Sequence, residues 1–133
     1  MSYVAISYAI VSLLSEITEL LAVYSKEPAE LLKYPCATVS SISHQNVPND
    51  TAANRRCYSH IIRLYYKLDS ANDAEGILRS IADLVIDKLE SHVSLNDTCD
   101  YSTPSKGIWR SAEREVPVKV VEITIDAYKR INR

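Results

Sequence analysis

The chain has 133 residues, of which 47% are hydrophobic and 24% are charged, the composition of a globular domain rather than of a disordered chain. A domain of this length buries roughly two thirds of the surface that its unfolded chain exposes, so it can fold without disulfides or metals. Its 15 Lys and Arg residues nearly balance 17 Asp and Glu residues, and the net charge of −2 provides no bulk field to attract nucleic acid or anionic lipid.

The first expected element is a helix from about Ser2 to Ala22. Its apolar residues recur at helical spacing: Ile6, Ile10, Leu13, Leu14, Ile17, Leu20 and Leu21. We expect neither a membrane span nor a secretory signal here, because Glu16 and Glu19 interrupt the apolar run and a basic leader is missing. A connector follows over residues 24–34, in which Pro28 leaves room for at most one helical turn.

Two strands are expected next, joined by a polar loop over Gln45 to Asn54. The run Cys36 to His44 is rich in Thr, Val, Ile and Ser but has few apolar residues, which predicts an edge strand or a sheet open on one face. The run Arg55 to Leu68 alternates strongly. One face of this strand is expected to carry Tyr58, Ile62, Leu64, Tyr66 and Leu68, and the other Ser59, Arg63 and Lys67.

A second helix is expected from Ala74 to about His92. Asn72 and Glu75 have the spacing of a capping box, and Glu75 complements the helix dipole. Its apolar stripe consists of Ile77, Leu78, Ile81, Leu84, Val85 and Leu89. A polar loop over Val93 to Lys106 then leads to a short strand, Ile108 to Arg114, and to a last strand, Val118 to Tyr128.

These elements predict an α+β fold in α-β-β-α-β-β order, with two helices packed on one face of a mostly antiparallel four-stranded sheet. The arrangement gives each apolar helix stripe a sheet to cover and each apolar sheet face a cover. The opposite face carries Ser, Arg and Lys, so we expect it to be solvated or to meet a partner. Residues 1–133 are expected to form a single domain, since no repeat or long linker divides them.

The sequence contains no recognisable reaction centre. Its two glycines, Gly76 and Gly107, are too few for a phosphate-binding loop of the P-loop or dinucleotide type, and no Gly-x-Ser-x-Gly motif occurs. Catalysis by an unrecognised constellation is left open. We therefore assign no catalytic, cofactor-binding or metal-binding residue.

The histidines and cysteines have structural explanations. His44 and His60 would lie near each other if the predicted hairpin closes, but no third ligand has metal-site spacing. The three cysteines are odd in number and widely spaced, which argues against a disulfide framework. We expect Cys36, Cys57 and Cys99 to be reduced and semi-buried.

Two stretches are candidate interfaces with another molecule. The first is the hairpin loop and the start of the following strand, with Asn49, Asp50, Thr51, Arg55 and Arg56; the alternative is an ordinary polar loop. The second is Trp109 with Arg110, two residue types that are enriched at interface hot spots. The alternative for Trp109 is closure of the end of the core. Nine Tyr, one Trp and no Phe give nearly every ring a polar tip suited to half-buried surfaces.

Several segments resemble the tail-terminator and neck proteins of long-tailed bacteriophages. The resemblance begins with a leading amphipathic helix, the sequence Tyr34-Pro35-Cys36-Ala37-Thr38-Val39 entering a strand, and a loop with Asn49-Asp50-Thr51. A strand headed by Asn54-Arg55-Arg56 follows, and then a helix of the form Ala-Glu-x-Ile-Leu-x-x-Ile-Ala-Asp. The resemblance covers most of the chain, and no functional motif is carried over residue by residue.

The resemblance implies a single tail-terminator-like domain with an α/β sandwich. Such proteins form a homo-oligomeric, hexameric ring that binds the tail tube protein, ends tail polymerisation and docks on the head connector. It implies a virion protein of the tail or neck, assembled in the host cytoplasm, with no cofactor, no catalysis, no sequence-specific nucleic acid and no membrane. The alternatives are a head-completion or head–tail adaptor subunit, and a small ligand-binding or enzymatic domain with a pocket between helices and sheet.

Overall fold

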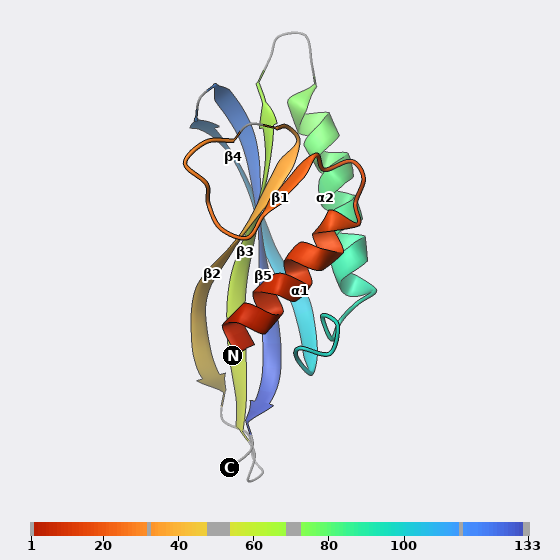
Figure 1. Cartoon of the computed structure of the whole chain (residues 1–133), viewed down its shortest axis with the longest axis vertical. Coiled ribbons are helices and arrows are strands. Elements are labelled where there is room, and N and C mark those ends of the chain that lie inside the picture. Colours follow the sequence, from red (N-terminus) through yellow and green to blue (C-terminus); the bar gives the residue numbers. More distant parts are fainter. Residues whose placement is uncertain (1, 32, 48–53, 69–72, 115, 132–133) are drawn as a thin grey trace.

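The computed structural model describes residues 2–31, 33–47, 54–68, 73–114 and 116–131. The elements in chain order are α1 (Ser2–Ser15), β1 (Ala22–Tyr24), β2 (Cys36–Val47), β3 (Asn54–Lys67), α2 (Ala74–Glu90), β4 (Tyr101–Glu113) and β5 (Pro117–Ile131). They form an α+β fold in which one sheet has the order β1-β2-β3-β5-β4 and both helices lie on one face (Figure 1). The predicted fold class is confirmed.

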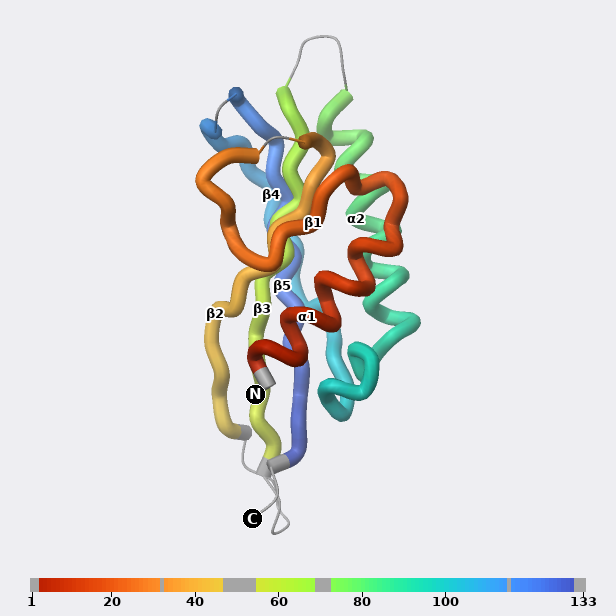
Figure 2. Tube along the Cα trace, viewed as in Figure 1, coloured from red at the N-terminus to blue at the C-terminus, as the bar shows by residue number. Residues whose placement is uncertain are grey.

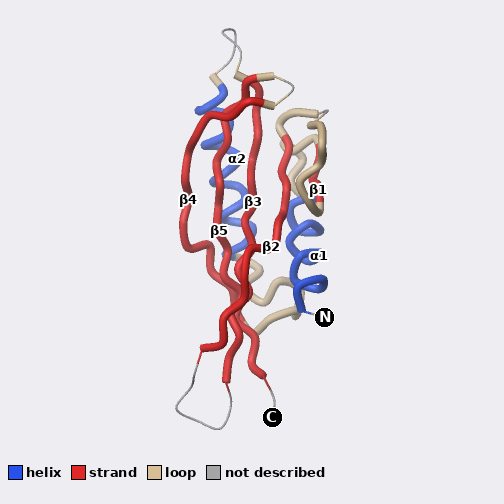
Figure 3. Tube along the Cα trace, turned by 90° about the vertical axis from the view of Figure 1, so that its left-hand side faces the viewer, coloured by secondary structure: helices blue, strands red, loops and turns tan. Residues whose placement is uncertain are grey.

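The sheet differs from the prediction in having five strands and mixed direction. β1 pairs with the start of β2 in parallel, whereas β2–β3, β3–β5 and β4–β5 are antiparallel. Figure 3 shows the molecule turned by 90°, with α2 behind the strands and α1 beside β2. The missing strand in the prediction was β1, whose three residues are too few to give a periodic signal.

α1 ends at Ser15 rather than near Ala22. After it, Ile17 N donates to Leu14 O (3.0 Å) and Leu20 N to Ile17 O (3.2 Å), so tight turns replace the helix. Ile17 and Leu20 are nevertheless buried, which explains why the apolar spacing looked helical. The prediction was wrong here because strand pairing of the next residues with β2 overrides the local helical pattern.

The inner face of β3 has the predicted alternation. Ile62 and Leu64 are fully buried and Tyr58 nearly so. They join the core with the inner residues of β2 and β5 and with the buried sides of α1 and α2, which lie next to each other in Figure 2. β2 is longer than predicted, since residues 45–47 of the expected loop pair with residues 55–57 of β3. The rest of that loop, 48–53, lies outside the described residues.

The opposite face of the sheet, predicted to be solvated or to meet a partner, is partly covered by the chain itself. A second cluster buries five side chains there: Leu31, Cys36, Tyr65, Val118 and Val120. Leu31 comes from the connector between β1 and β2, which shows no helix in its described residues. The connector therefore covers one end of this face, a long-range contact that the alternation of β3 alone does not reveal.

β4 begins at Tyr101, well before the predicted start at Ile108. The polar residues of its first half pair with β5, with an irregularity between Pro104 and Lys106. An edge strand can carry polar residues on both faces because neither face needs to be covered, so the stretch lacked the apolar signal of a strand. In the segment between α2 and β4, the three consecutive residues Leu95 to Asp97 have positive φ.

α2 is capped by Asp73 and not by the predicted Asn72, which lies outside the described residues. The Asp73 carboxylate accepts a hydrogen bond from Gly76 N (3.0 Å). A Cβ on Gly76 would approach this carboxylate to 2.1 Å, so glycine permits the cap. The predicted stripe is otherwise buried, apart from Leu84, which is 39% exposed, and the partly buried Ile77.

We expect Asp73→Ala to lower the free energy of unfolding by about 1 kcal/mol, because a helical N–H loses its side-chain acceptor. The matched control is Asp83→Ala, which removes an exposed carboxylate from the middle of the same helix. Urea unfolding followed by circular dichroism measures both. Equal effects of the two substitutions would contradict the assignment of Asp73 as the cap.

Candidate functional site

The predicted interface residues occupy two separate places in the sheet. Arg55 and Arg56 lie at the end of β3 that pairs with Arg130 and Lys129 of β5. Arg110 pairs with Val120, near the other end of β5. The structure therefore does not unite the two predicted groups, and Asn49, Asp50 and Thr51 lie outside the described residues.

Arg55 and Arg56, at the start of β3, are held by aromatic and amide groups. Arg55 lies over the Tyr101 ring, 5.4 Å from its centroid. Arg56 donates to Asn46 Oδ1 (3.0 Å) and to the Tyr58 hydroxyl (3.2 Å). With Lys129 and Arg130 beside them, they make this end of the sheet basic.

Trp109 does not close the core. It is 37% exposed on β4, where it pairs with Val121, and its neighbour Ile108 is 43% exposed. The structure therefore places Trp109 at the surface of the sheet edge rather than at the end of the core. The edge of the sheet thus presents two large apolar side chains next to each other in sequence and on opposite faces.

A row of ion pairs crosses the outer face of the sheet. Arg110 on β4 contacts Glu122 on β5 (3.3 Å), Glu122 contacts Arg63 on β3 (2.6 Å), and Arg63 contacts Glu27 of the connector (3.4 Å). Burial disfavours the charged form of Glu122, but the hydrogen bonds from Arg63 and Arg110 outweigh it and lower the pKa of this carboxyl group.

Glu27 ties the connector to the sheet. Its carboxylate accepts hydrogen bonds from Thr38 Oγ1 on β2 and from the Tyr65 hydroxyl on β3 (2.9 Å). Burial, reinforced by the bond to Glu27, raises the pKa of Tyr65 to about 12. Arg114 also contacts Glu27 (3.7 Å) and donates to the carbonyl of Pro28 (2.8 Å). Every charge of the row is therefore matched by an opposite one, which fixes the connector in place.

A cluster of aromatic rings lies beneath the start of α1. Tyr3 makes a hydrogen bond to His44 Nδ1 (3.0 Å), and its ring meets that of Tyr58 edge-on at 4.9 Å. His60 is fully buried beside Tyr3, and neither of its ring nitrogens has a hydrogen-bond partner among the described residues. Burial lowers the pKa of His60, an effect that backbone groups of Tyr3 and Tyr58 only partly oppose. Burial therefore favours the neutral form of the ring.

The structure does not pair the two histidines as a metal site. His44 lies opposite Tyr58, whereas His60 lies opposite Ser41. Among the described residues, no group of three His, Cys, Asp or Glu side chains is placed to hold a metal ion. No disulfide links the described cysteines; Cys36 and Cys99 are buried and Cys57 is partly exposed.

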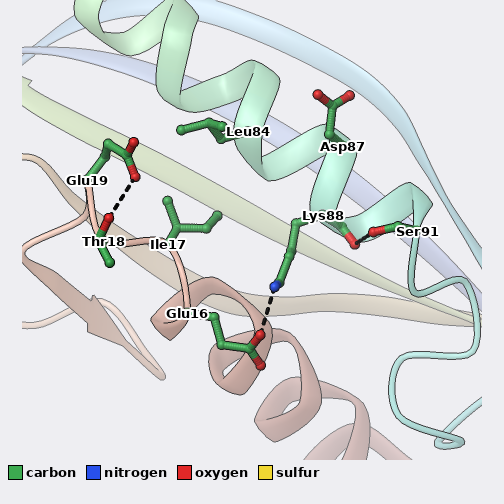
Figure 4. Close-up of a pocket in the computed structure, with 8 residues that line it drawn as sticks. All are labelled: Glu16, Ile17, Thr18, Glu19, Leu84, Asp87, Lys88 and Ser91. Atoms are coloured by element: carbon green, nitrogen blue, oxygen red, sulfur yellow. Dashed lines mark hydrogen bonds and ion pairs between the residues drawn. The ribbon is translucent and has the colours of Figure 1, made fainter.

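A hollow of about 360 Å³ opens where the end of α1 meets α2 (Figure 4). Ile17 and Leu84 form its apolar part, and Glu16, Glu19 and Asp87 give it a negative rim. Lys88, the one basic residue that lines it, is bound to Glu16 (2.7 Å). The hydrogen bond to Lys88 lowers the pKa of Glu16. This surface depression offers an acidic rim rather than convergent acid and base groups.

Sequence reasoning missed the ion-pair row, although part of its signal was present. Arg63 was assigned to the outer face of β3, and an acidic residue on an adjacent strand is the natural partner for it. Glu27 and Arg114 lie far from Arg63 in the sequence, so strand alternation did not indicate that they contact the same row. The burial of His60 was also missed, although alternation along the strand places its side chain on the same face of β3 as Tyr58 and Ile62.

No protein-family model matches the chain. No curated protein shows a significant sequence match. In the described part of the chain, no helix has the length and apolar character needed to cross a membrane.

Proposed function

We propose that this protein is a structural subunit of the tail or neck of a long-tailed bacteriophage. In this function, copies of the chain form a closed ring that caps the tail tube, ends its polymerisation and joins the tail to the head. The resemblance of the segments around Cys36, Arg55 and α2 to tail-terminator proteins supports the proposal, as does the α+β fold with both helices on one face.

The observation that carries the proposal is the state of the two sheet edges. Beyond Thr38, β2 has no strand partner on its outer side within the described residues, and β4 pairs with β5 alone. Exposed apolar side chains lie at both edges: Ile42 on β2, and Ile108 and Trp109 on β4. Unpaired strand edges with apolar groups are natural contact elements between subunits, and a ring needs two unlike contact surfaces on each copy.

The test is the mass of the purified protein in solution, measured over a range of concentrations, together with negative-stain images. We expect rings of uniform diameter, formed by the protein alone or on added tail tubes. A protein that stays monomeric at high concentration and does not bind tail tubes would contradict the proposal. Binding to head connectors but not to tubes would instead identify the adaptor function.

A further inference from the structure

One end of the sheet gathers cations from two neighbouring strands. Arg55 of β3 lies opposite Arg130 of β5, and Arg56 lies opposite Lys129. Because side chains alternate between the faces of a strand, the first pair lies on the outer face and the second on the inner face, the face that carries Tyr58. The strands reach beyond both helices at this end (Figures 1 and 3). We call these four basic residues the basic end.

The arginines of the basic end differ from the other described arginines in having no carboxylate partner. The arginines elsewhere in the described chain all form ion pairs with glutamates: Arg63, Arg79, Arg110 and Arg114. By contrast, no carboxylate of the described residues lies within ion-pair distance of any cation of the basic end. Arg55 Nε is buried and has no hydrogen-bond acceptor in that part of the chain. A cation that is partly removed from water and has no counter-charge is stabilised by an anion from outside.

Aromatic rings pack against two of these arginines. Arg55 lies over the Tyr101 ring and Arg56 over the Tyr58 ring, 5.4 and 6.0 Å from the ring centroids. Tyr101 in turn stacks on Tyr128, with the two ring centroids 4.7 Å apart. A guanidinium group that is already held in place loses less side-chain freedom when it binds a planar anion. The basic end is therefore preorganised to bind carboxylate or phosphate.

Acidic residues at the same end favour a protein over nucleic acid as the source of this anion. Asp100 accepts a hydrogen bond from the backbone N–H of Arg130 (2.7 Å), and Asp126 accepts one from the Ser59 hydroxyl (2.6 Å). Their carboxylates would repel a chain of phosphates, as would the net charge of −2 of the whole protein. The cations also lie in two pairs on opposite faces of the sheet, whereas a nucleic-acid strand needs a continuous basic groove.

The residue types of this end also fit a protein partner. Tyr101 is 39% exposed, and Arg130 beside it on the outer face is exposed too. Tyrosine and arginine are enriched in protein interfaces and among their hot spots, whereas lysine is depleted there. Three of the four cations of the basic end are arginines. Charge and composition together therefore indicate a protein surface that carries carboxylates.

We propose that the basic end binds an acidic segment of a partner protein, whose carboxylates pair with Arg55, Arg56 and Arg130. The inference goes beyond the proposed ring and does not depend on it, because the basic end is complete within a single copy of the chain. It gives the two arginines that the sequence singled out as interface candidates a partner of defined chemistry.

Binding of an acidic peptide by the full chain tests the proposal. The probe is a fluorescein-labelled peptide of alternating Glu and Gly, and fluorescence anisotropy measures its dissociation constant. We expect Arg55→Gln with Arg130→Gln to weaken binding by at least about tenfold, as for interface hot spots. The matched control, Lys26→Gln with Lys33→Gln, removes the same charge from two exposed positions of the connector, and we expect it to bind as the original protein does.

Two further measurements guard against loss of the fold and locate the peptide. Circular dichroism checks the double variant, and Arg130→Gln alone changes only an exposed side chain, so it should weaken binding without unfolding the protein. A carbodiimide joins a peptide carboxylate to a nearby lysine amine as an amide, with loss of water. We expect mass spectrometry to find the peptide attached to Lys129 in preference to Lys26.

Three results would overturn the proposal. The first is no binding of the acidic peptide at low salt. The second is equal weakening by the basic-end variant and by the connector control, because the peptide would then respond to net charge alone. The third is tighter binding of a single-stranded DNA oligonucleotide of equal charge through the same arginines, which would make nucleic acid the occupant.

Discussion

We expect Leu14→Ala to lower the free energy of unfolding by about 2–5 kcal/mol, the range for truncating a buried leucine to alanine. Leu14 is fully buried in the core between α1, the sheet and α2. α1 has no acidic residue in its first turn and no basic residue in its last, so its attachment depends on this packing. Urea unfolding monitored by circular dichroism measures the loss.

Leu84→Ala is the control for this prediction. Leu84 is a leucine on a helix too, but it is 39% exposed on α2, so its truncation leaves little cavity. We expect a change of about 0.5 kcal/mol, the usual range for surface positions. A loss at Leu14 no larger than that at Leu84 would show that α1 does not pack as described.

We expect the protein to lose stability as the pH falls below about 6.5, in a manner that depends on His60. The ring is fully buried, no hydrogen-bond partner holds its nitrogens among the described residues, and burial lowers its pKa. Groups facing it include Tyr3 of α1 and Tyr58 of β3, with Arg56 bonded to Tyr58. None of these supplies a negative charge at neutral pH that would favour the protonated ring.

The sign follows from the direction of the pKa change. Between the lowered pKa of the folded state and the ordinary value, the unfolded chain binds one more proton than the folded chain at this site. The contribution of the neutral ring to stability is therefore complete above the ordinary pKa of histidine. It is lost as the pH falls toward the pKa of His60 in the folded chain, by up to about 1.4 kcal/mol per pH unit. Below the folded value the loss is constant.

The measurement compares the original protein with His60→Leu by urea unfolding at several values between pH 5.5 and 7.5. Leucine cannot be protonated, so the variant should lack this part of the slope. His92→Gln is the control, because His92 lies at the end of α2 and is only partly buried. Equal slopes of the unfolding free energy against pH for the original protein and for His60→Leu would contradict the prediction.

Two parts of the molecule differ in their formal charge. The outer face balances every charge of its row across four segments of the chain, which holds the connector in place. α1 and β2, by contrast, carry no formal charge.

The fold class, the placement of both helices on one face and the inner face of β3 could be predicted from the sequence. Each of these follows from periodic burial within a continuous segment: a helix stripe such as Leu78 to Leu89, or the alternation of Tyr58, Ile62 and Leu64. The sequence also indicated Trp109 and Arg110 as surface candidates, through residue type alone. Local patterns are enough to predict which side of a helix or strand is buried when that segment packs against a single surface.

The tertiary structure alone decided the features that join distant segments. Strand β1 exists because it pairs with β2, the connector covers the sheet because Glu27 reaches Arg63, and β4 starts early because β5 offers it a partner. The lack of charge in α1 and β2 can be read from the sequence, but only the fold puts the two elements on the same side. Such contacts bring together segments that are many residues apart. The hydrophobic periodicity within one segment therefore does not reveal them.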